Sequence, residues 1–191
     1  MSWLGASILG LLCFSFLEYV HHRHAGHLRW FGRRLFDAHM AHHRDPREGG
    51  VSFPEKMRQR APLVVVLSVA LFLLAWPWGG VAHAVVFTKA AVLGYVYSEW
   101  FHHTMHHRAP RTRFERWMWL HHYAHHFADA NANYGFTSPL WDYVFGTRNN
   151  ITRVVVPDAQ LPGPSELFTG VSLRSEVAAA RRRGRPPPSA Q

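Results

Sequence analysis

Apolar residues are concentrated in three blocks, which alternate with polar segments rich in His and Arg. The first block, residues 3–17, leads directly into Glu18 and Tyr19. It predicts one helix over residues 2–24, whose apolar part is slightly shorter than the ~20 residues that cross a bilayer. We expect the helix to be retained, because no basic segment precedes it and no small-residue cleavage site follows it. Gly26 is expected to end or bend it.

The second and third blocks predict a helical hairpin. Residues 62–76 form an uninterrupted apolar run without charge, and residues 81–101 form the return helix. Between them, Trp76-Pro77-Trp78-Gly79-Gly80 has the aromatic, Pro and Gly residues typical of a tight turn at a membrane interface. Lys89 lies near the middle of the return helix, where a charge must either snorkel to the interface or face protein.

The polar segments predict shorter helices outside the bilayer. One helix is expected around residues 33–43 and another over residues 111–127, whereas residues 134–147 suggest a loop with a short amphipathic element. From about residue 163 the hydrophobic pattern is lost. We therefore divide the chain into a membrane domain, residues 1–162, and a basic, Pro-rich tail, residues 163–191, which we expect to be disordered.

The charge distribution favours a membrane partner over nucleic acid. The net charge is +9, but the arginines lie beside apolar spans, as they do in proteins that face an anionic membrane surface. The segments before residue 62 and after residue 101 are basic, while the Trp76–Gly80 turn has no basic residue, so the positive-inside rule places both segments in the cytoplasm. The only cysteine, Cys13, excludes a disulfide framework and a Cys-type zinc site.

Histidine provides the candidate chemistry. Of the 16 histidines, only His83 lies outside four clusters, and we interpret it as a polar residue at the membrane interface. The clusters occupy residues 21–27, 39–43, 102–107 and 121–126. All four fall on the predicted cytoplasmic side, although the positive-inside rule does not take histidine into account.

The spacing within the clusters predicts metal binding. Two clusters have histidines at i, i+3 and i+4, which share one helix face, and a third has a pair at i, i+4; these residues are His39, His42 and His43, then His122, His125 and His126, then His102 and His106. His22 and His27 are five residues apart, and a straight helix would splay them unless a break at Gly26 turned His27 back. His21 with His24, at i, i+3, is the alternative pair.

The number of histidines suggests two ions. Helical pairs of neutral imidazoles suit Zn, Fe, Cu or Ni, and a single zinc ion takes only four ligands. Eight to ten well-spaced histidines are too many for one ion, so we expect two ions that share ligands from four segments. The remaining cluster members are expected to hold the ligands in place or to face solvent; they are His21, His24, His103, His107 and His121. Beside a membrane hairpin, such a site favours oxygen chemistry on a lipid.

These motifs resemble the fatty acid hydroxylase/sterol desaturase superfamily of membrane di-iron enzymes over roughly residues 15–147. Glu18 to Arg23 resembles the opening motif of the fatty acid 2-hydroxylase branch, and the stretch from Gly135 to Thr147 resembles its ending. The resemblance implies an all-α fold in which membrane helices carry a cytoplasmic helical cap. It also implies ten metal ligands: His22, His27, His39, His42, His43, His102, His106, His122, His125 and His126.

The resemblance further implies an activity. Two iron ions, for which zinc can substitute in preparations, would use O2 to hydroxylate or desaturate a lipid acyl chain. No cytochrome b5 domain is fused, so electrons are expected from a separate cytochrome b5-like protein or a ferredoxin. Several further side chains near the clusters are expected to hold ligand N–H groups rather than bind metal; they are Glu18, Asp37, Glu99, Asp142 and His107.

Two alternatives remain at this stage. Short bacterial carotenoid hydroxylases are similar in length and histidine spacing, although the Trp-Asp-x-Val-Phe-Gly-Thr ending favours the fatty acid and sterol branch. A non-catalytic metal-storage or transport protein is the second alternative. Against it, no cluster lies along the hairpin, where a conduction path would run.

Overall fold

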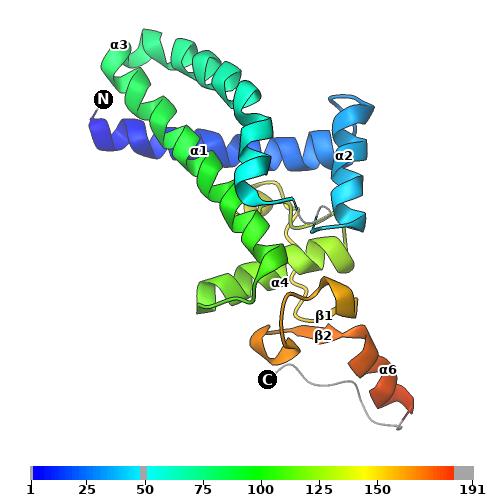
Figure 1. The fold of residues 1–191 in the computed structure, drawn as a ribbon. Coiled ribbons are helices and arrows are strands. Elements are labelled where there is room, and N and C mark those ends of the chain that lie inside the picture. The colour runs from blue at the N-terminus through cyan, green and yellow to red at the C-terminus, as the bar shows by residue number, and fades with distance from the viewer. Residues whose placement is uncertain (1, 48–50, 183–191) are drawn as a thin grey trace.

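The structure is a computed structural model that describes residues 2–47 and 51–182. The fold is mostly helical, as expected. Two short strands and two short 3₁₀ helices lie between residues 154 and 173 (Figure 1). In chain order the elements are α1 (Trp3–Val20), the π-helix η1 (His21–His27), α2 (Arg33–Arg44), α3 (Phe53–His107), α4 (Arg113–Phe127), α5 (Leu140–Val144), β1 (Val154–Val156), η3 (Asp158–Gln160), η4 (Ser165–Leu167), β2 (Val171–Leu173) and α6 (Arg174–Arg182).

The predicted hairpin is present as α3. Its helical geometry breaks at Gly80, where φ is 71°, a value that glycine adopts without strain. The two arms, residues 53–79 and 81–107, then run back along each other (Figure 1). Both arms are longer than their apolar cores, because their polar ends continue as helix toward the histidine clusters.

Helix α1 packs closely along α3, and two glycines permit this. A Cβ on Gly10 would lie 2.3 Å from the carbonyl oxygen of Phe87, and one on Gly94 would lie 2.7 Å from the ring of Phe14. The ring of Trp3 stacks on His83 with 4.6 Å between centroids, so the start of α1 lies beside the hairpin turn.

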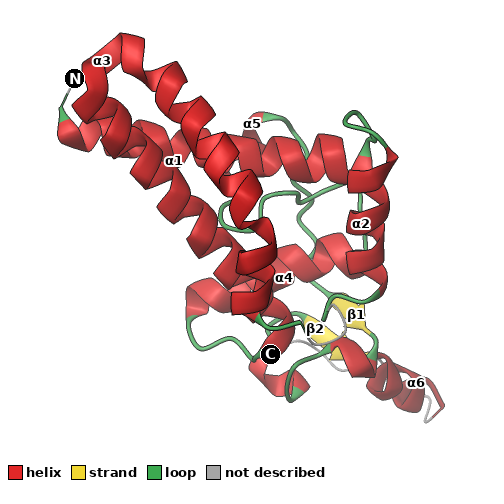
Figure 2. Ribbon diagram, turned by 45° about the horizontal axis from the view of Figure 1, so that its top comes forward, coloured by secondary structure: helices red, strands yellow, loops and turns green. Residues whose placement is uncertain are grey.

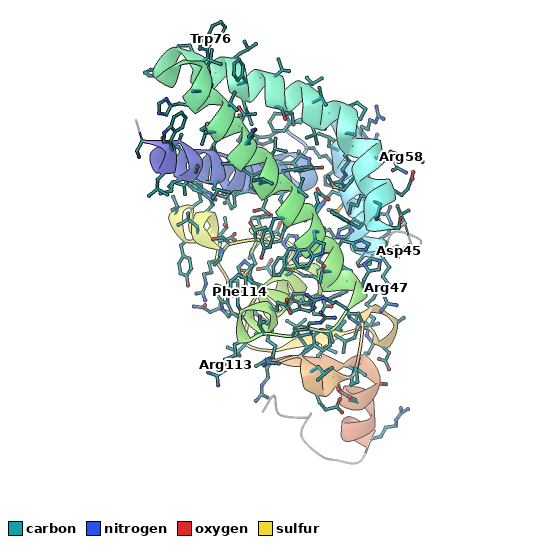
Figure 3. The ribbon with its side chains drawn as sticks, turned by 60° about the vertical axis from the view of Figure 1, so that its left-hand side comes forward. Asp45, Arg47, Arg58, Trp76, Arg113 and Phe114 are labelled. Carbon is teal, nitrogen blue, oxygen red and sulfur yellow. The ribbon has the colours of Figure 1, made fainter. Side chains whose placement is uncertain are left out.

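Within residues 2–47 and 51–182, two helical stretches are long and apolar enough to cross a membrane, namely Trp3–His27 and Phe53–His107. In the most apolar 18-residue window of α3 no residue is buried in the protein, which is unlike the core helix of a soluble domain. Trp76 lies at the hairpin tip, whereas Arg58 and Arg47 lie toward the opposite end (Figure 3). Lys89 is exposed rather than turned into protein, which leaves snorkelling as the expected way to accommodate its charge in a bilayer.

The polar helices form at the end of α3 away from the hairpin turn. Helix α2 agrees with its predicted range. Helix α4 begins after Thr112, whose side-chain hydroxyl accepts a hydrogen bond from the backbone N–H of Glu115 at 3.1 Å. A hydrogen bond from Arg108 lowers the pKa of the Glu115 carboxyl and outweighs burial, which would raise it. The same ion pair holds the first turn of α4 in place.

The predicted boundary after residue 162 is wrong for the part of the tail that the structure describes. Strand β2 pairs in parallel with β1, Val171 opposite Val154, and both strands lie beside α4 (Figure 2). Phe168 and Val171 belong to one buried cluster with Trp119 of α4. Residues 163–182 are therefore part of the fold, while residues 183–191, which contain the three consecutive prolines, lie outside the described residues.

We expect Phe168→Ala to lower the free energy of unfolding by about 3–4 kcal/mol, because Phe168 is only 4% exposed and its ring stacks on Tyr123 at 6.0 Å between centroids. Thermal unfolding of the purified protein measures the change. The neighbouring Leu167→Ala is the matched control, since Leu167 is 43% exposed. Equal melting temperatures for the two variants would mean that this segment does not contribute to the core.

Candidate metal centre

The ten histidines that the sequence singled out gather into two groups of five. Within each group, one ring nitrogen per residue lies within 4.8 Å of all the others. The first histidine group contains His22, His27, His39, His43 and His125, and the second histidine group contains His42, His102, His106, His122 and His126. Helices α2 and α4 each contribute to both groups, so neighbouring residues on one helix turn serve different groups.

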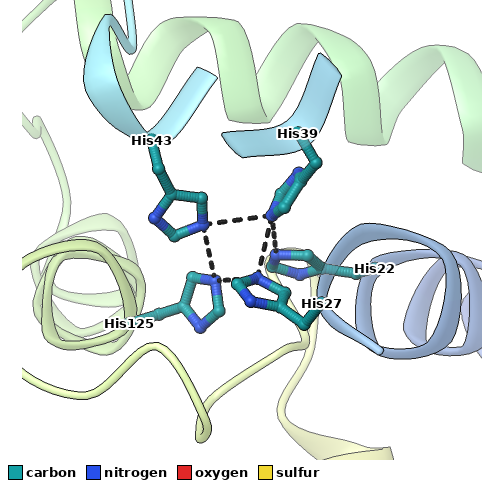
Figure 4. A group of neighbouring side chains, drawn as sticks. All are labelled: His22, His27, His39, His43 and His125. Carbon is teal, nitrogen blue, oxygen red and sulfur yellow. Dashed lines mark hydrogen bonds between the residues drawn. The ribbon is translucent and has the colours of Figure 1, made fainter. Parts of the chain in front are cut away.

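In the first histidine group, the Nε2 atoms converge (Figure 4). His39 Nε2 lies 3.1 Å from His22 Nε2, 2.9 Å from His27 Nε2 and 3.0 Å from His43 Nε2. His125 Nε2 closes the ring at 3.0 Å from His27 and 3.2 Å from His43. If two nitrogen atoms each bind one ion at about 2.1 Å and at a right angle to each other, they lie about 3.0 Å apart. The spacing therefore fits a shared cation better than a set of neutral hydrogen bonds.

The second histidine group is more deeply buried. His106 Nε2 lies 2.9 Å from His122 Nε2, and the ring of His42 lies 4.7 to 5.0 Å from the rings of His102, His106 and His126. Neither ring nitrogen of His126 has a hydrogen-bond partner among the described residues, although both are buried. Orphaned buried nitrogens are costly unless something else binds them, and a metal ion does so.

The π-helix explains how His22 and His27 meet. The sequence predicts an end or bend of the helix at Gly26, but the helix instead continues to His27 with wider turns. The backbone N–H of Leu28 bonds the carbonyl of Arg23 at 3.0 Å, an i→i+5 bond that places residues five apart one turn apart. The two imidazole centroids are 5.3 Å apart, so they point to the same side. His21 and His24, the alternative pair, belong to neither group.

Gly26 therefore has a different role from the predicted helix break. A Cβ at this position would lie 2.9 Å from Cδ2 of His39, closer than real Cβ contacts occur. Only glycine lets η1 and α2 approach closely enough for the His39 ring to enter the first histidine group.

We expect Gly26→Ala to displace the His39 ring and to lower the metal content of the purified protein, with about 1–3 kcal/mol of overpacking cost. Metal-to-protein ratios from mass spectrometry and melting temperature measure the two effects. Gly32→Ala is the control: its φ of 92° strains any side chain, yet nothing lies within 4 Å of the added Cβ. That variant should lose stability while it keeps its metal; a Gly26→Ala protein with full metal content would contradict the packing argument.

Backbone carbonyls orient two of the imidazoles. His22 Nδ1 bonds the carbonyl oxygen of Tyr134, and His125 Nδ1 bonds that of Ala132 at 2.7 Å. With Nδ1–H donating to a carbonyl, Nε2 carries the lone pair that a metal needs. These partners could not be predicted from the sequence, because a carbonyl has no sequence signature. The buried Asn133 between them, with φ of 60°, is the one local signal.

Burial keeps the candidate ligands neutral. It lowers the pKa of His43 to about 3, with further lowering from His27 and His42. Burial, and then neighbouring imidazoles, also lower the pKa values of His39, His122, His125 and His126. Neutral imidazole is the form that binds metal, so both groups are ready to do so at neutral pH.

The expected supporting carboxylates divide into different roles. Asp142 is fully buried and accepts hydrogen bonds from the backbone N–H groups of Tyr134 and Gly135, each at 2.8 Å. It thus holds the segment whose carbonyl orients His22. It also accepts a hydrogen bond from the Thr147 hydroxyl at 2.8 Å and lies 3.3 Å from His121, which is buried but outside both groups.

The other supporting candidates lie farther from the rings. Glu18 accepts hydrogen bonds from Ser98, at 2.8 Å, and from Thr137. Glu99 pairs with Lys56 and Arg60. The structure contradicts two expectations, because both residues are exposed: Asp37 has only a 3.9 Å pair with Arg33, and His107 bonds the carbonyl of His103.

One aromatic ring lies against both groups. Phe136 stacks on His102 with 4.6 Å between centroids and contacts His22 edge-on at 5.4 Å. Among the aromatic rings other than histidine that the structure describes, it alone contacts members of both groups. This position gives the space between the two groups an apolar wall.

Comparison with known proteins places the chain in a family. The model of the fatty acid hydroxylase family matches residues 7–147, which include every member of both histidine groups. The chain belongs to the fatty acid hydroxylase family. The resemblance drawn from the histidine motifs is therefore confirmed.

Curated family members are similar over most of this chain. Dihydroceramide fatty acyl 2-hydroxylase FAH2 of Arabidopsis thaliana is 34% identical over 72% of this chain and 58% of its own. The fatty acid 2-hydroxylase of Mus musculus is 30% identical over 76% of this chain and 40% of its own. A solved structure of full-length scs7p, with only the hydroxylase domain visible, matches with a TM-score of 0.62 and 25% identity, over 78% of this chain and 58% of that one. This chain spans less than two thirds of the length of each.

Proposed function

We propose that the protein is a membrane-bound, iron-dependent hydroxylase of a lipid acyl chain. The observation that carries the proposal is the pair of histidine groups at the polar end of apolar helices, in a chain that belongs to this family. The names of the relatives, fatty acyl 2-hydroxylases of dihydroceramide or fatty acid, point to carbon 2 of an acyl chain as the position that is hydroxylated.

The donor set fits one iron ion in each histidine group. Ten neutral imidazoles without thiolate suit a divalent transition metal, and zinc is the ion most apt to replace iron in preparations. When bound, the two iron ions would activate O2 for attack on an unactivated C–H bond. The protein holds the Nε2 lone pairs inward through the carbonyls of Tyr134 and Ala132, and burial excludes water from the second histidine group.

An acyl chain suits the surroundings of the two groups. The apolar arms of α3 offer a bilayer-facing surface next to the site, and Phe136 provides an apolar wall between the groups. Contact with Phe136 would hold a methylene group between the rings and keep bulk water away from it. Desaturation also begins with abstraction of one hydrogen atom, so the site itself does not distinguish the two reactions. The names of the relatives favour hydroxylation.

The overall reaction requires an external reductant. Hydroxylation consumes the substrate, O2, two electrons and two protons, and it yields the alcohol and water. We propose that a cytochrome b5-like protein or a ferredoxin supplies the electrons on the cytoplasmic side. The basic segments that flank the hairpin support this orientation through the positive-inside rule.

Lipid mass spectrometry of an expressing host tests the proposal. We expect 2-hydroxylated acyl lipids with the native chain and none with His125→Ala, at equal protein levels. Hydroxylated carotenoid in a host fed β-carotene, without hydroxylated acyl lipid, would favour the carotenoid hydroxylase alternative. Purified protein that holds metal but consumes no O2 with reductant and lipid would favour the storage alternative.

A further inference from the structure

Helix α5 lies against the membrane-facing part of α1. Trp141 donates a hydrogen bond from Nε1 to the hydroxyl of Ser15 at 3.0 Å, and its ring meets Phe16 edge-on at 5.0 Å between centroids. Phe145, directly after α5, contacts Phe16 and stacks on Tyr19 at 5.2 Å. Of these three α1 residues, Ser15 and Phe16 belong to the apolar stretch, and Tyr19 lies two residues after its end.

The depth of this contact follows from helix geometry. Eighteen residues of α1 rise about 27 Å, close to the thickness of a hydrocarbon core. Trp3 at the start of α1 lies beside the hairpin turn, which marks the far interface. Ser15 is five residues before the end of α1, so the contact with Trp141 lies roughly 8 Å inside that end. Because the apolar stretch of α1 ends at residue 17, the contact with Trp141 lies near its polar end, at the level of the interface.

The two faces of α5 differ sharply. Asp142 on the inner face is fully buried, whereas Tyr143 and Val144 are each 58% exposed. Leu140 and Phe145 extend the exposed apolar face. The Arg148 guanidinium lies 4.5 Å from the centroid of the Tyr143 ring, a pairing suited to the headgroup level.

We propose that this outer face of α5 rests in the interfacial layer of the bilayer, in the leaflet next to the histidine groups, as a third membrane contact besides α1 and α3. The occupant is lipid, because Phe16, exposed on the apolar stretch of α1, contacts Trp141 and Phe145 and so joins this face to the membrane-facing helix. Asp142 on the inner face holds the N–H groups of Tyr134 and Gly135, so the lipid contact also anchors the segment that orients His22.

The single cysteine makes a direct test possible. In a Cys13→Ser background, three exposed valines can each be replaced by Cys and labelled with the fluorophore NBD: Val144 on α5, Val69 on α3 as the lipid-facing control, and Val155 on β1 as the water-facing control. The full chain is reconstituted in phosphatidylcholine nanodiscs that contain lipids spin-labelled either near the headgroup or near the chain end. Iodide serves as the quencher in water.

At Val144→Cys we expect the label near the headgroup to quench about twofold more than the label near the chain end, since interfacial side chains lie ~5–10 Å deep. Val155→Cys should respond only to iodide, and Val69→Cys to the deeper lipid label. Iodide quenching at Val144→Cys as strong as at Val155→Cys would overturn the proposal. Shielding from every quencher would also overturn it, because a second copy or another protein would then cover the face.

A second labelled position, Tyr143→Cys, repeats the measurement if the first variant is unstable, and the same outcomes apply. The quenching does not depend on catalysis. A chain that proved not to hydroxylate lipid would still show the lipid contact, and a hydroxylase could lack it. The two proposals therefore fail separately.

Discussion

Replacement of His106 by Ala should abolish hydroxylation, while the same change at the adjacent His107 should leave it intact. His106 is buried in the second histidine group, and its Nε2 lies 2.9 Å from that of His122. Loss of one of five imidazoles removes a ligand and leaves a cavity in a dry site. We expect product formation to fall by about 100-fold or more, since even changes outside the ligand set cost 10–100-fold.

Metal content separates the two variants independently of catalysis. His106→Ala should lose close to one of two ions per chain, with the first histidine group still loaded. His107 is exposed, stacks on His103 and lies outside both groups, so His107→Ala should keep both ions. Lipid mass spectrometry and metal-to-protein ratios measure both effects. If both variants kept both ions, or both lost one, the division into groups would be contradicted.

The hairpin and eight of the ten histidines could be predicted because both depend on local periodicity, whereas His22 and His27, five residues apart, were implied by the family resemblance. Uninterrupted apolar runs flanking a Trp-Pro-Trp-Gly-Gly turn specify two membrane helices whatever else the chain contains. The i, i+3, i+4 spacing places imidazoles on one helix face before any tertiary contact forms. The division into two groups was not predictable in the same way, because adjacent residues such as His42 and His43 enter different groups only once α2 packs beside η1 and brings His42 against the histidines of α3.

What the sequence did not reveal depends on tertiary contacts or on the backbone. The π-helix at His21–His27 requires i→i+5 bonds that no residue type specifies, and Gly26 was misread because its neighbour His39 is distant in sequence. The carbonyls of Ala132 and Tyr134 leave no side-chain signal. Strands of three residues are too short to show alternation, so the sequence predicted neither β1 nor β2, and β2 was assigned to the tail.

Two aspartates that the sequence treated alike differ in the structure, and this difference yields the second large prediction. Asp142 is fully buried and accepts four hydrogen-bonding contacts, from Tyr134, Gly135, Thr147 and His121. In Asp142→Asn, one oxygen becomes an NH2 group that faces N–H or O–H donors. We expect a loss of about 2–4 kcal/mol of stability, together with a lower metal content as the segment that orients His22 shifts. Asp37→Asn is the matched control, because Asp37 is exposed, and it should change stability by less than about 0.5 kcal/mol.

The pH dependence of the same pair of variants gives a sharper test. Burial alone would raise the pKa of Asp142, but hydrogen bonds from His121, Gly135, Thr147 and Tyr134 outweigh it and bring the pKa below its ordinary value of 3.8. A carboxyl with a lowered folded pKa stabilises the fold fully above its unfolded pKa, and this contribution is lost as the pH falls through the folded pKa. The gap in unfolding free energy between the native chain and Asp142→Asn should therefore stay constant from about pH 5 to 8 and shrink below about pH 4. A gap that grew on acidification would mean that Asp142 is protonated in the folded protein, and the carboxylate would then not hold Tyr134 and Gly135 in the way these contacts indicate.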